Sequence, residues 1–104
     1  MKSLVMHPFY IQQVLDGQVS FDARGYDTWV KGDFYIYDSK AKALVGIITI
    51  TGTHRITIAE YYEWHHMTLD RENTNMSYEC YAWDFINPRR IDPIKIDKPK
   101  DKRV

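Results

Sequence analysis

The clearest alternation of apolar and polar residues runs from Val19 to Arg24 and has the period of two that is typical of a half-buried strand. Its apolar positions are Val19, Phe21 and Ala23. Its polar positions are Ser20, Asp22 and Arg24. Because successive side chains of a strand point to opposite faces, the pattern predicts that the apolar set packs on the core. The polar set then lies on the other side, as an ordinary solvated face or as the wall of a binding cleft.

Two segments have apolar residues at helical spacing. The first follows His7-Pro8, since a proline in the first turn loses no helical hydrogen bond, and it ends before Gly17, which suits a left-handed C-terminal cap. The residues predicted to share its buried face are Tyr10, Ile11, Val14 and Leu15. The second segment begins at Thr57, which forms a capping-box pattern with Glu60. It carries Tyr61, Tyr62, Trp64 and His65.

Runs of β-branched and aromatic residues predict further strands at 4–6, 34–37, 44–51, 78–86 and 91–96. Residues 38–42 join two of them as a hairpin, and residues 25–32 and 69–77 have the composition of loops. Gly46 interrupts one strand and indicates a bulge or a close approach of another segment. About six strands, mostly in succession, and two short flanking helices predict an α+β fold with an antiparallel or mixed sheet, curled into a small β-barrel.

Length and charge limit the possible partners. The 104 residues suffice for one domain, expected over residues 1–96, and the charged residues 97–104 are expected to form a disordered tail. The 14 basic and 14 acidic residues cancel, so a nucleic acid has to be held by a local basic patch. The single cysteine, Cys80, excludes an internal disulfide. No apolar run has membrane-spanning length, and residues 1–6 are too short for a signal-peptide core, which predicts a cytoplasmic protein without membrane contact.

Three stretches together resemble the ASCH domain family. They are LDGQVSFDAR, with a carboxylate two residues before an arginine, FYIYDSKAKALVGIITITG, with Ser-Lys in a hairpin loop, and YAWDFINPRRIDPIKI. The resemblance covers roughly residues 2–96. It implies a PUA-like fold, a small β-barrel with helices beside it. It also implies a cleft that holds RNA or a modified nucleobase, with the 19–24 strand as one wall.

With this resemblance, the cleft becomes the preferred interpretation of the 19–24 strand. Arg24 offers rigidly spaced donors to a phosphate or a base edge, and Asp22 can accept from an amine or fix Arg24 in place. Trp29, in a polar loop, is the candidate for stacking on a base. The predicted nucleic-acid-binding residues are Ser20, Asp22, Arg24, Trp29, Ser39, Lys40, Arg89 and Arg90.

Two other functions stay open from the sequence. In a ribonuclease-type hydrolase acting in the same cleft, Asp22 or His65 would be the base, and Lys40 or Arg24 would stabilise the developing negative charge. In a protein-binding module the cleft would be vestigial. No cofactor and no metal are predicted, because His65 and His66 are adjacent on a helix, point about 100° apart and rarely reach one ion together.

Some small ASCH proteins resemble an amidohydrolase that removes acetyl from N4-acetylcytidine. The resemblance implies a lysine, a hydroxyl and a glutamate at the positions where this sequence has Val19, Asp22 and His65. The isopropyl group of Val19 can neither attack a carbonyl nor relay a proton. The amidohydrolase activity is therefore predicted to be absent.

Overall fold

Five strands and two helices make up the part of the chain that the computed structural model describes, residues 2–68 and 80–97. In chain order they are β1 (Lys2–Met6), α1 (Pro8–Leu15), β2 (Phe21–Arg24), β3 (Gly32–Asp38), β4 (Ala43–Ile56), α2 (Ile58–Thr68) and β5 (Cys80–Lys95). The predicted loop at 69–77 and residues 98–104 of the predicted tail lie outside the described residues. Within the described part, neither helix is long and apolar enough to cross a membrane.

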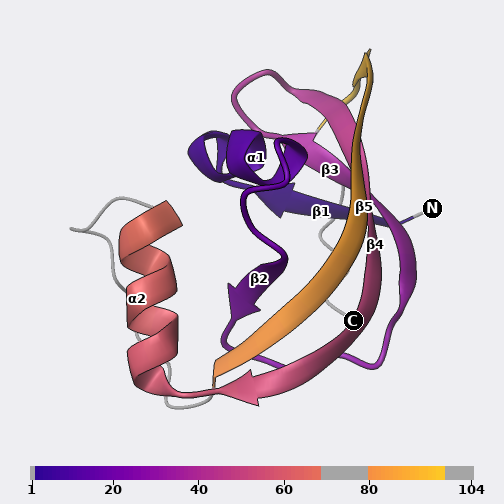
Figure 1. The fold of residues 1–104 in the computed structure, drawn as a ribbon. Coiled ribbons are helices and arrows are strands. Elements are labelled where there is room, and N and C mark those ends of the chain that lie inside the picture. Colours follow the sequence, from indigo (N-terminus) through magenta and orange to yellow (C-terminus); the bar gives the residue numbers. More distant parts are fainter. Residues whose placement is uncertain (1, 69–79, 98–104) are drawn as a thin grey trace.

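All five strands belong to one sheet, in the order β1-β3-β4-β5-β2. β1 runs parallel to β3, and the other neighbouring pairs are antiparallel. The sheet curves around the core, with α1 and α2 on its concave side (Figure 1). β1 and β2 occupy the two edges and do not pair with each other, so the sheet is not closed into the predicted barrel. The α+β class and the mixed sheet are confirmed.

The two C-terminal strands predicted from the sequence are one long strand, β5, so the described residues form five strands rather than six. The Asn87-Pro88 pair, which has the composition of a turn, is accommodated as a bulge. It lies opposite the stretch of β4 between Ile47 and Thr49, where the register shifts, and Asn87 has a φ of 55°. Pro88 has no N–H to contribute to a ladder, so a strand tolerates it best at such an interruption.

α1 begins and ends at the predicted residues, whereas β2 starts later than predicted. His7 caps the N-terminus of α1, since its Nδ1 atom accepts a hydrogen bond of 3.2 Å from the Phe9 N–H. Past the C-terminus, Gly17 has a φ of 73°, a left-handed conformation that glycine adopts without strain. Helix-type hydrogen bonds continue as far as the N–H of Gln18. The chain is therefore still turning where the sequence predicted a strand, and β2 begins only at Phe21.

The predicted capping box starts α2. The Thr57 N–H donates to Glu60 Oε1, and the Glu60 N–H donates to Thr57 Oγ1, each at 3.1 Å. These bonds to the backbone and hydroxyl of Thr57 lower the pKa of Glu60. Further along α2, Trp64 is buried in the core and Tyr61 packs half-buried against it.

Gly46 lies next to a register shift in the pairing of β4 with β5, and it also allows α1 to approach the sheet closely. A Cβ at this position of β4 would lie 2.6 Å from Leu15 Cδ2 and 3.0 Å from the carbonyl oxygen of Arg89. Leu15 belongs to the buried face of α1, together with the other three residues predicted for that face. Any side chain at residue 46 would therefore displace the Leu15 side chain and crowd the Arg89 carbonyl.

We expect Gly46→Ala to lower the free energy of unfolding by about 1–3 kcal/mol, because the methyl group overpacks the contact with Leu15 and a backbone carbonyl. Gly52→Ala is the matched control, since Gly52 lies in the same strand with no atom within 4 Å of a Cβ. Urea unfolding of both variants measures the difference. The double variant Leu15→Ala with Gly46→Ala removes the side chain that the new methyl group would meet, so it should lose less stability than the two single variants together. Fully additive losses in the free energy of unfolding would contradict the proposed clash.

Candidate functional site

A cavity of about 270 Å³ lies where the two edge strands of the sheet fail to meet. β1 and the start of α1 form one side, β2 and the residues after it form another, and α2 contributes aromatic rings. Its lining comprises Val5, Met6, His7, Tyr10, residues 22–26, Tyr61 and Trp64. These segments are distant in the sequence, so the tertiary fold alone brings them together.

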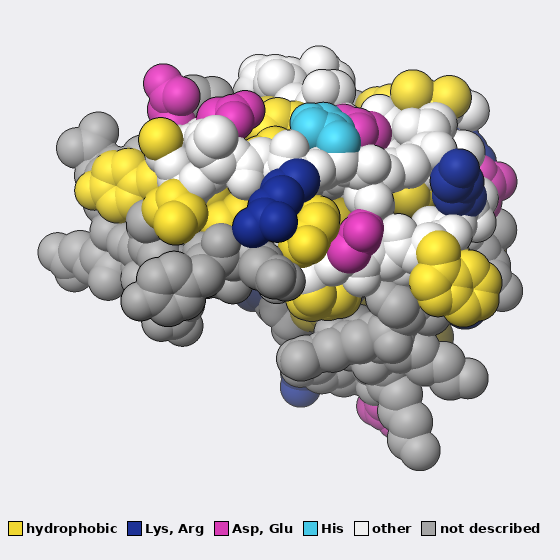
Figure 2. Space-filling model, turned by 90° about the horizontal axis from the view of Figure 1, so that it is seen from below, with side chains coloured by type: hydrophobic (Ala, Val, Ile, Leu, Met, Phe, Trp, Pro, Cys, Tyr) yellow, Lys and Arg dark blue, Asp and Glu magenta, His cyan; other side chains and the backbone are white. Residues whose placement is uncertain are grey.

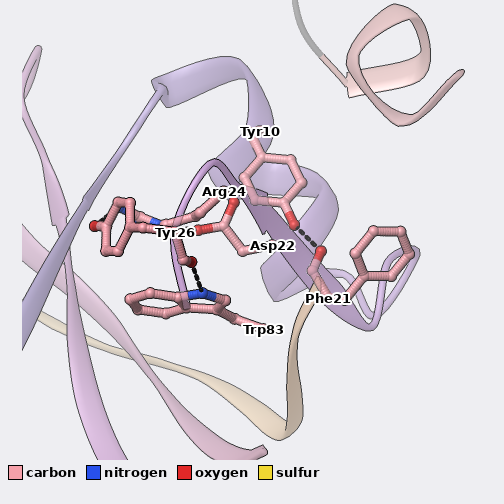
Figure 3. A network of polar contacts seen from close by, with 6 residues as sticks. All are labelled: Tyr10, Phe21, Asp22, Arg24, Tyr26 and Trp83. Carbon is pink, nitrogen blue, oxygen red and sulfur yellow. Dashed lines mark hydrogen bonds and ion pairs between the residues drawn. The ribbon is translucent and has the colours of Figure 1, made fainter. Parts of the chain in front are cut away.

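The polar wall of the cavity is a buried ion pair on β2. The Arg24 Nε atom donates to Asp22 Oδ2 at 2.7 Å (Figure 3). Asp22 is 5% exposed, and the Arg24 side chain is 16% exposed. A buried carboxylate without a partner costs several kcal/mol, so Asp22 depends on Arg24 for its place in the interior.

Aromatic residues fix the orientation of Arg24. Its Nη1 atom donates to the Tyr26 hydroxyl at 3.3 Å, and its guanidinium carbon lies 5.1 Å from the centre of the Trp83 ring, within range of a cation–π interaction. Trp83 in turn donates from Nε1 to the Tyr26 carbonyl at 3.0 Å, and the two rings meet edge to face at 5.3 Å (Figure 3). The loop after β2 is thus attached to β5 beneath the ion pair.

The charge state of Arg24 is fixed by these neighbours. Burial lowers the pKa of Arg24. Electrostatic interactions with Asp22 and Tyr26, and the hydrogen bonds to both side chains, raise it by more, so the pKa lies above its ordinary value. Arg24 is therefore a permanent cation whose charge is neutralised by Asp22.

Tyr10 closes the cavity on the α1 side. Its hydroxyl donates to the main-chain carbonyl of Phe21, and its ring meets Trp64 edge to face at 5.2 Å. Burial, and then the negative charge of Asp22, raise the pKa of Tyr10. Tyr10 is consequently a neutral hydrogen-bond donor across the whole physiological range.

The ion pair keeps hydrogen-bonding capacity for a ligand. Within the described residues, Arg24 Nη2 and Asp22 Oδ1 make no hydrogen bond to the protein. The pair therefore offers a donor and an acceptor side by side, without net charge, next to aromatic rings. Such a wall suits a planar, polar and uncharged ligand.

Of the residues predicted for the cleft wall, Asp22 and Arg24 line this cavity, and their roles in binding stay predictions. Ser20 precedes β2 and lies at a neighbouring hollow of about 280 Å³. Asp22 is buried whereas Phe21 is only half-buried, the reverse of the burial that the alternation predicted. The reason is that side chains from outside the sheet pack against β2: Trp64 of α2 lies 6.4 Å from the Phe21 ring, and Tyr10 of α1 lies beside Asp22.

Three other predicted binding residues do not line this cavity. Trp29 is 85% exposed in the loop before β3, as its polar surroundings predicted. Ser39 and Lys40 are exposed in the turn between β3 and β4, where the Lys40 N–H donates to Asp38 Oδ1 at 2.9 Å. Their roles in binding stay predictions.

Arg89 and Arg90 also lie outside the cavity lining, and both are paired with acidic side chains. Arg89 Nη2 is 3.2 Å from Asp33 Oδ2, and Arg90 Nη2 is 2.6 Å from Asp16 Oδ1. On the face shown in Figure 2, the described basic and acidic side chains are likewise interspersed. Both pairs are surface pairs outside the cavity, whereas the Asp22–Arg24 pair is buried and lines it, so the pair on β2 is the stronger candidate site.

Several cavity residues are not among those that the sequence predicts for the site. These are His7 and Tyr26, and also Tyr10, for which the sequence predicts only a place in the core. A tyrosine on the buried face of a helix indicates that a polar group lies nearby, because its hydroxyl needs a hydrogen-bond partner in the interior. His65, a predicted base, belongs to α2, but its side chain lies outside the described residues.

Solved structures that share this fold include ASCH from Zymomonas mobilis. Its crystal structure gives a TM-score of 0.72 at 13% sequence identity, covering 90% of this chain and 72% of that chain. Two point mutants of that protein give TM-scores of 0.70 and 0.71 at 12% and 11% identity, covering 89% and 90% of this chain and 72% and 74% of theirs. No family model and no curated protein matches the sequence. The likeness establishes the fold, which is ASCH-like, as the resemblance predicted.

Tyr10→Phe tests the buried hydroxyl through the pH dependence of stability. Near pH 8 we expect the variant to be less stable than wild type by about 1 kcal/mol, since it loses the hydrogen bond to the Phe21 carbonyl. The folded pKa of Tyr10 lies above its ordinary value of 10.0, so above pH 10 the hydroxyl ionises only in the unfolded wild type. The stability difference should then shrink by up to about 1.4 kcal/mol per pH unit. Urea unfolding between pH 8 and 11 measures it, and a constant difference would contradict the burial.

Proposed function

We propose that this chain binds a single nucleobase, of an RNA or of a modified nucleotide, in the cavity beside β2. The observation that carries the proposal is the buried Asp22–Arg24 pair, which lines a cavity otherwise rich in aromatic side chains. At about 270 Å³, the cavity is slightly smaller than the roughly 300–1,000 Å³ of typical small-molecule sites, which suits one base better than a longer ligand.

The chemistry of the wall matches that of a base. Asp22 can accept from an amino or ring N–H group, and Arg24 can donate to a ring nitrogen or a carbonyl oxygen. Tyr10, Tyr26 and Trp64 provide apolar ring surface for the faces or edges of a flat ligand. The ASCH-like fold adds support, because the sequence resemblance implies an RNA- or base-binding cleft next to this strand.

Binding is favoured over hydrolysis by the state of the candidate catalytic groups. Oδ2 of Asp22 already accepts a hydrogen bond from Arg24 Nε at 2.7 Å, so this oxygen is engaged in holding the arginine. Lys40 lies in the turn between β3 and β4 and does not line the cavity. The proposal is therefore a binding module in which the ion pair recognises the ligand rather than activating water.

We expect short single-stranded RNA to bind weakly, with an affinity that falls as salt rises, and Arg24→Ala to weaken binding by about 1–3 kcal/mol. Arg89→Ala is the matched control: it removes the same charge from an exposed surface pair, and its effect should be much smaller. Fluorescence titration at two salt concentrations measures both.

Arg24→Ala also leaves Asp22 without a partner, so circular dichroism has to show that the variant is folded. Arg24→Lys keeps a cation beside Asp22 but lacks the planar fork, and it should weaken binding while preserving the fold. If Arg24→Ala left RNA binding unchanged and Arg89→Ala abolished it, the cavity would not be the binding site.

We also expect no deacetylation of N4-acetylcytidine. Val19, at the position where the resembling amidohydrolases have a lysine, lines the neighbouring hollow together with Glu60 and Glu63, away from the ion pair. Val19→Lys should not create the activity, because the new amine would lie beside these carboxylates and stay protonated. Incubation of the nucleoside with either protein and chromatography for cytidine checks this. Turnover on the order of 10 s⁻¹ by the wild type would show that the catalytic residues were misplaced.

A further inference from the structure

The cavity touches three consecutive residues of β2: Asp22, Ala23 and Arg24. Side chains alternate between the two faces of a strand, so Asp22 and Arg24 lie on one face and Ala23 lies on the other. The cavity is also lined by Val5 and Met6 of β1, the strand at the other edge of the sheet, which does not pair with β2. It therefore adjoins the free edge of β2, where the main chain is accessible from the side.

The hydrogen bonds of β2 show which main-chain groups face that edge. The Phe85 N–H donates to the Ser20 carbonyl at 3.0 Å, so residue 20 is directed toward β5. In an antiparallel ladder, hydrogen-bonded and non-hydrogen-bonded positions alternate, which directs residues 22 and 24 toward β5 as well. The N–H and C=O groups of Phe21 and Ala23 then point away from β5. The Tyr10 hydroxyl confirms this direction, because it reaches the Phe21 carbonyl from that side.

The Ala23 N–H and C=O groups thus face the cavity, and no described strand pairs with that edge of β2. Main-chain polar groups in a largely buried position are almost always hydrogen-bonded, to water or to a ligand where the protein supplies no partner. Ala23 itself is 7% exposed. This places a second donor and a second acceptor within the same wall as the Asp22–Arg24 pair.

We propose that the main chain of Ala23 hydrogen-bonds the ligand of this cavity, with its N–H donating to an acceptor and its C=O accepting from a donor on the same edge of the ligand. The inference deepens the proposed function and rests on it. It assigns the ligand a chemical class: a flat molecule whose edge carries a donor next to an acceptor, as in a lactam or an amino-imine group. Asp22 and Arg24 then flank this edge.

The same geometry disfavours an extended peptide added to the sheet. Strand addition uses a row of main-chain groups along an edge. β2 has four residues, Tyr10 already occupies the Phe21 carbonyl, and only one outward-facing residue, Ala23, lies along the cavity. One donor and one acceptor match a single flat group, not a strand.

An amide-to-ester replacement tests the main chain directly. Full-length protein in which Ala23 is replaced by lactate lacks this N–H and keeps the methyl side chain. Replacing Phe21 by phenyllactate is the matched control, since its N–H also faces the free edge but Phe21 does not line the cavity. Each ester weakens one ladder bond to β5 by altering the carbonyl of the preceding residue, so the two variants are equally perturbed in the sheet.

The probes are adenosine, cytidine, guanosine and uridine, and separately 2-piperidone with its N-methyl derivative, which lacks the donor. Titrations are followed by the ¹⁵N–¹H signal of Ala23 in the wild type and by affinity in the ester variants. We expect at least one nucleoside, and 2-piperidone but not its N-methyl derivative, to shift the Ala23 signal. The Ala23 ester should weaken binding about three- to tenfold, and the Phe21 ester less than twofold.

The outcomes separate the two proposals. If a nucleoside bound and Arg24→Lys weakened it, but the Ala23 ester bound as tightly as wild type, main-chain recognition would be wrong and the proposed function would stand. If no nucleoside or RNA bound but 2-piperidone still shifted Ala23, the main-chain site would stand and the nucleobase would be the wrong ligand. Failure of every probe to shift Ala23 or bind would overturn both.

Discussion

The buried ion pair between Asp22 and Arg24 is the interaction on which the cavity depends. A carboxylate at 5% exposure needs a cation beside it, and that cation needs its own support in the interior. Trp83 supplies this support from below through its ring, and Tyr26 supplies it through its hydroxyl. Because Trp83 also donates to the Tyr26 carbonyl, β2, β5 and the loop after β2 are connected around the pair. Removal of either charge would therefore disturb the packing and the cavity together.

The cavity in front of this ion pair exists because the sheet is open between β1 and β2. Closure of the barrel would require β1 and β2 to pair, and their pairing would fill the space that the cavity occupies. α1 and α2 cover the opening instead, and they contribute ring side chains such as Tyr10 and Trp64 rather than main-chain partners. A gap between strand edges thus becomes a site lined by side chains and by main-chain groups. The charges of the ion pair cancel and the main-chain groups are neutral. This absence of net charge is in keeping with the base, rather than a phosphate, that we propose as the ligand.

Several local features of this fold could be predicted from short stretches of sequence. The start of α1 at Pro8, the capping box at Thr57 and the close approach at Gly46 each depend on a few neighbouring residues or on the absence of a side chain. The strand through Asn87 could not be predicted in the same way, because local composition favours a turn there. The pairing with β4 overrides that preference, since a bulge lets the ladder continue on both sides.

The sequence by itself determined the α+β class and the buried face of α1, and it pointed to Asp22 and Arg24 as one polar pair, since these follow from local periodicity or from the resemblance. Only the tertiary structure decided that Asp22 is buried and that Phe21 is the more exposed of the two. Alternation indicates which residues share a face of a strand, but it does not indicate what covers each face. In this chain side chains of α1 and α2 pack against an edge strand, so burial follows from distant helices rather than from the polarity of the strand itself.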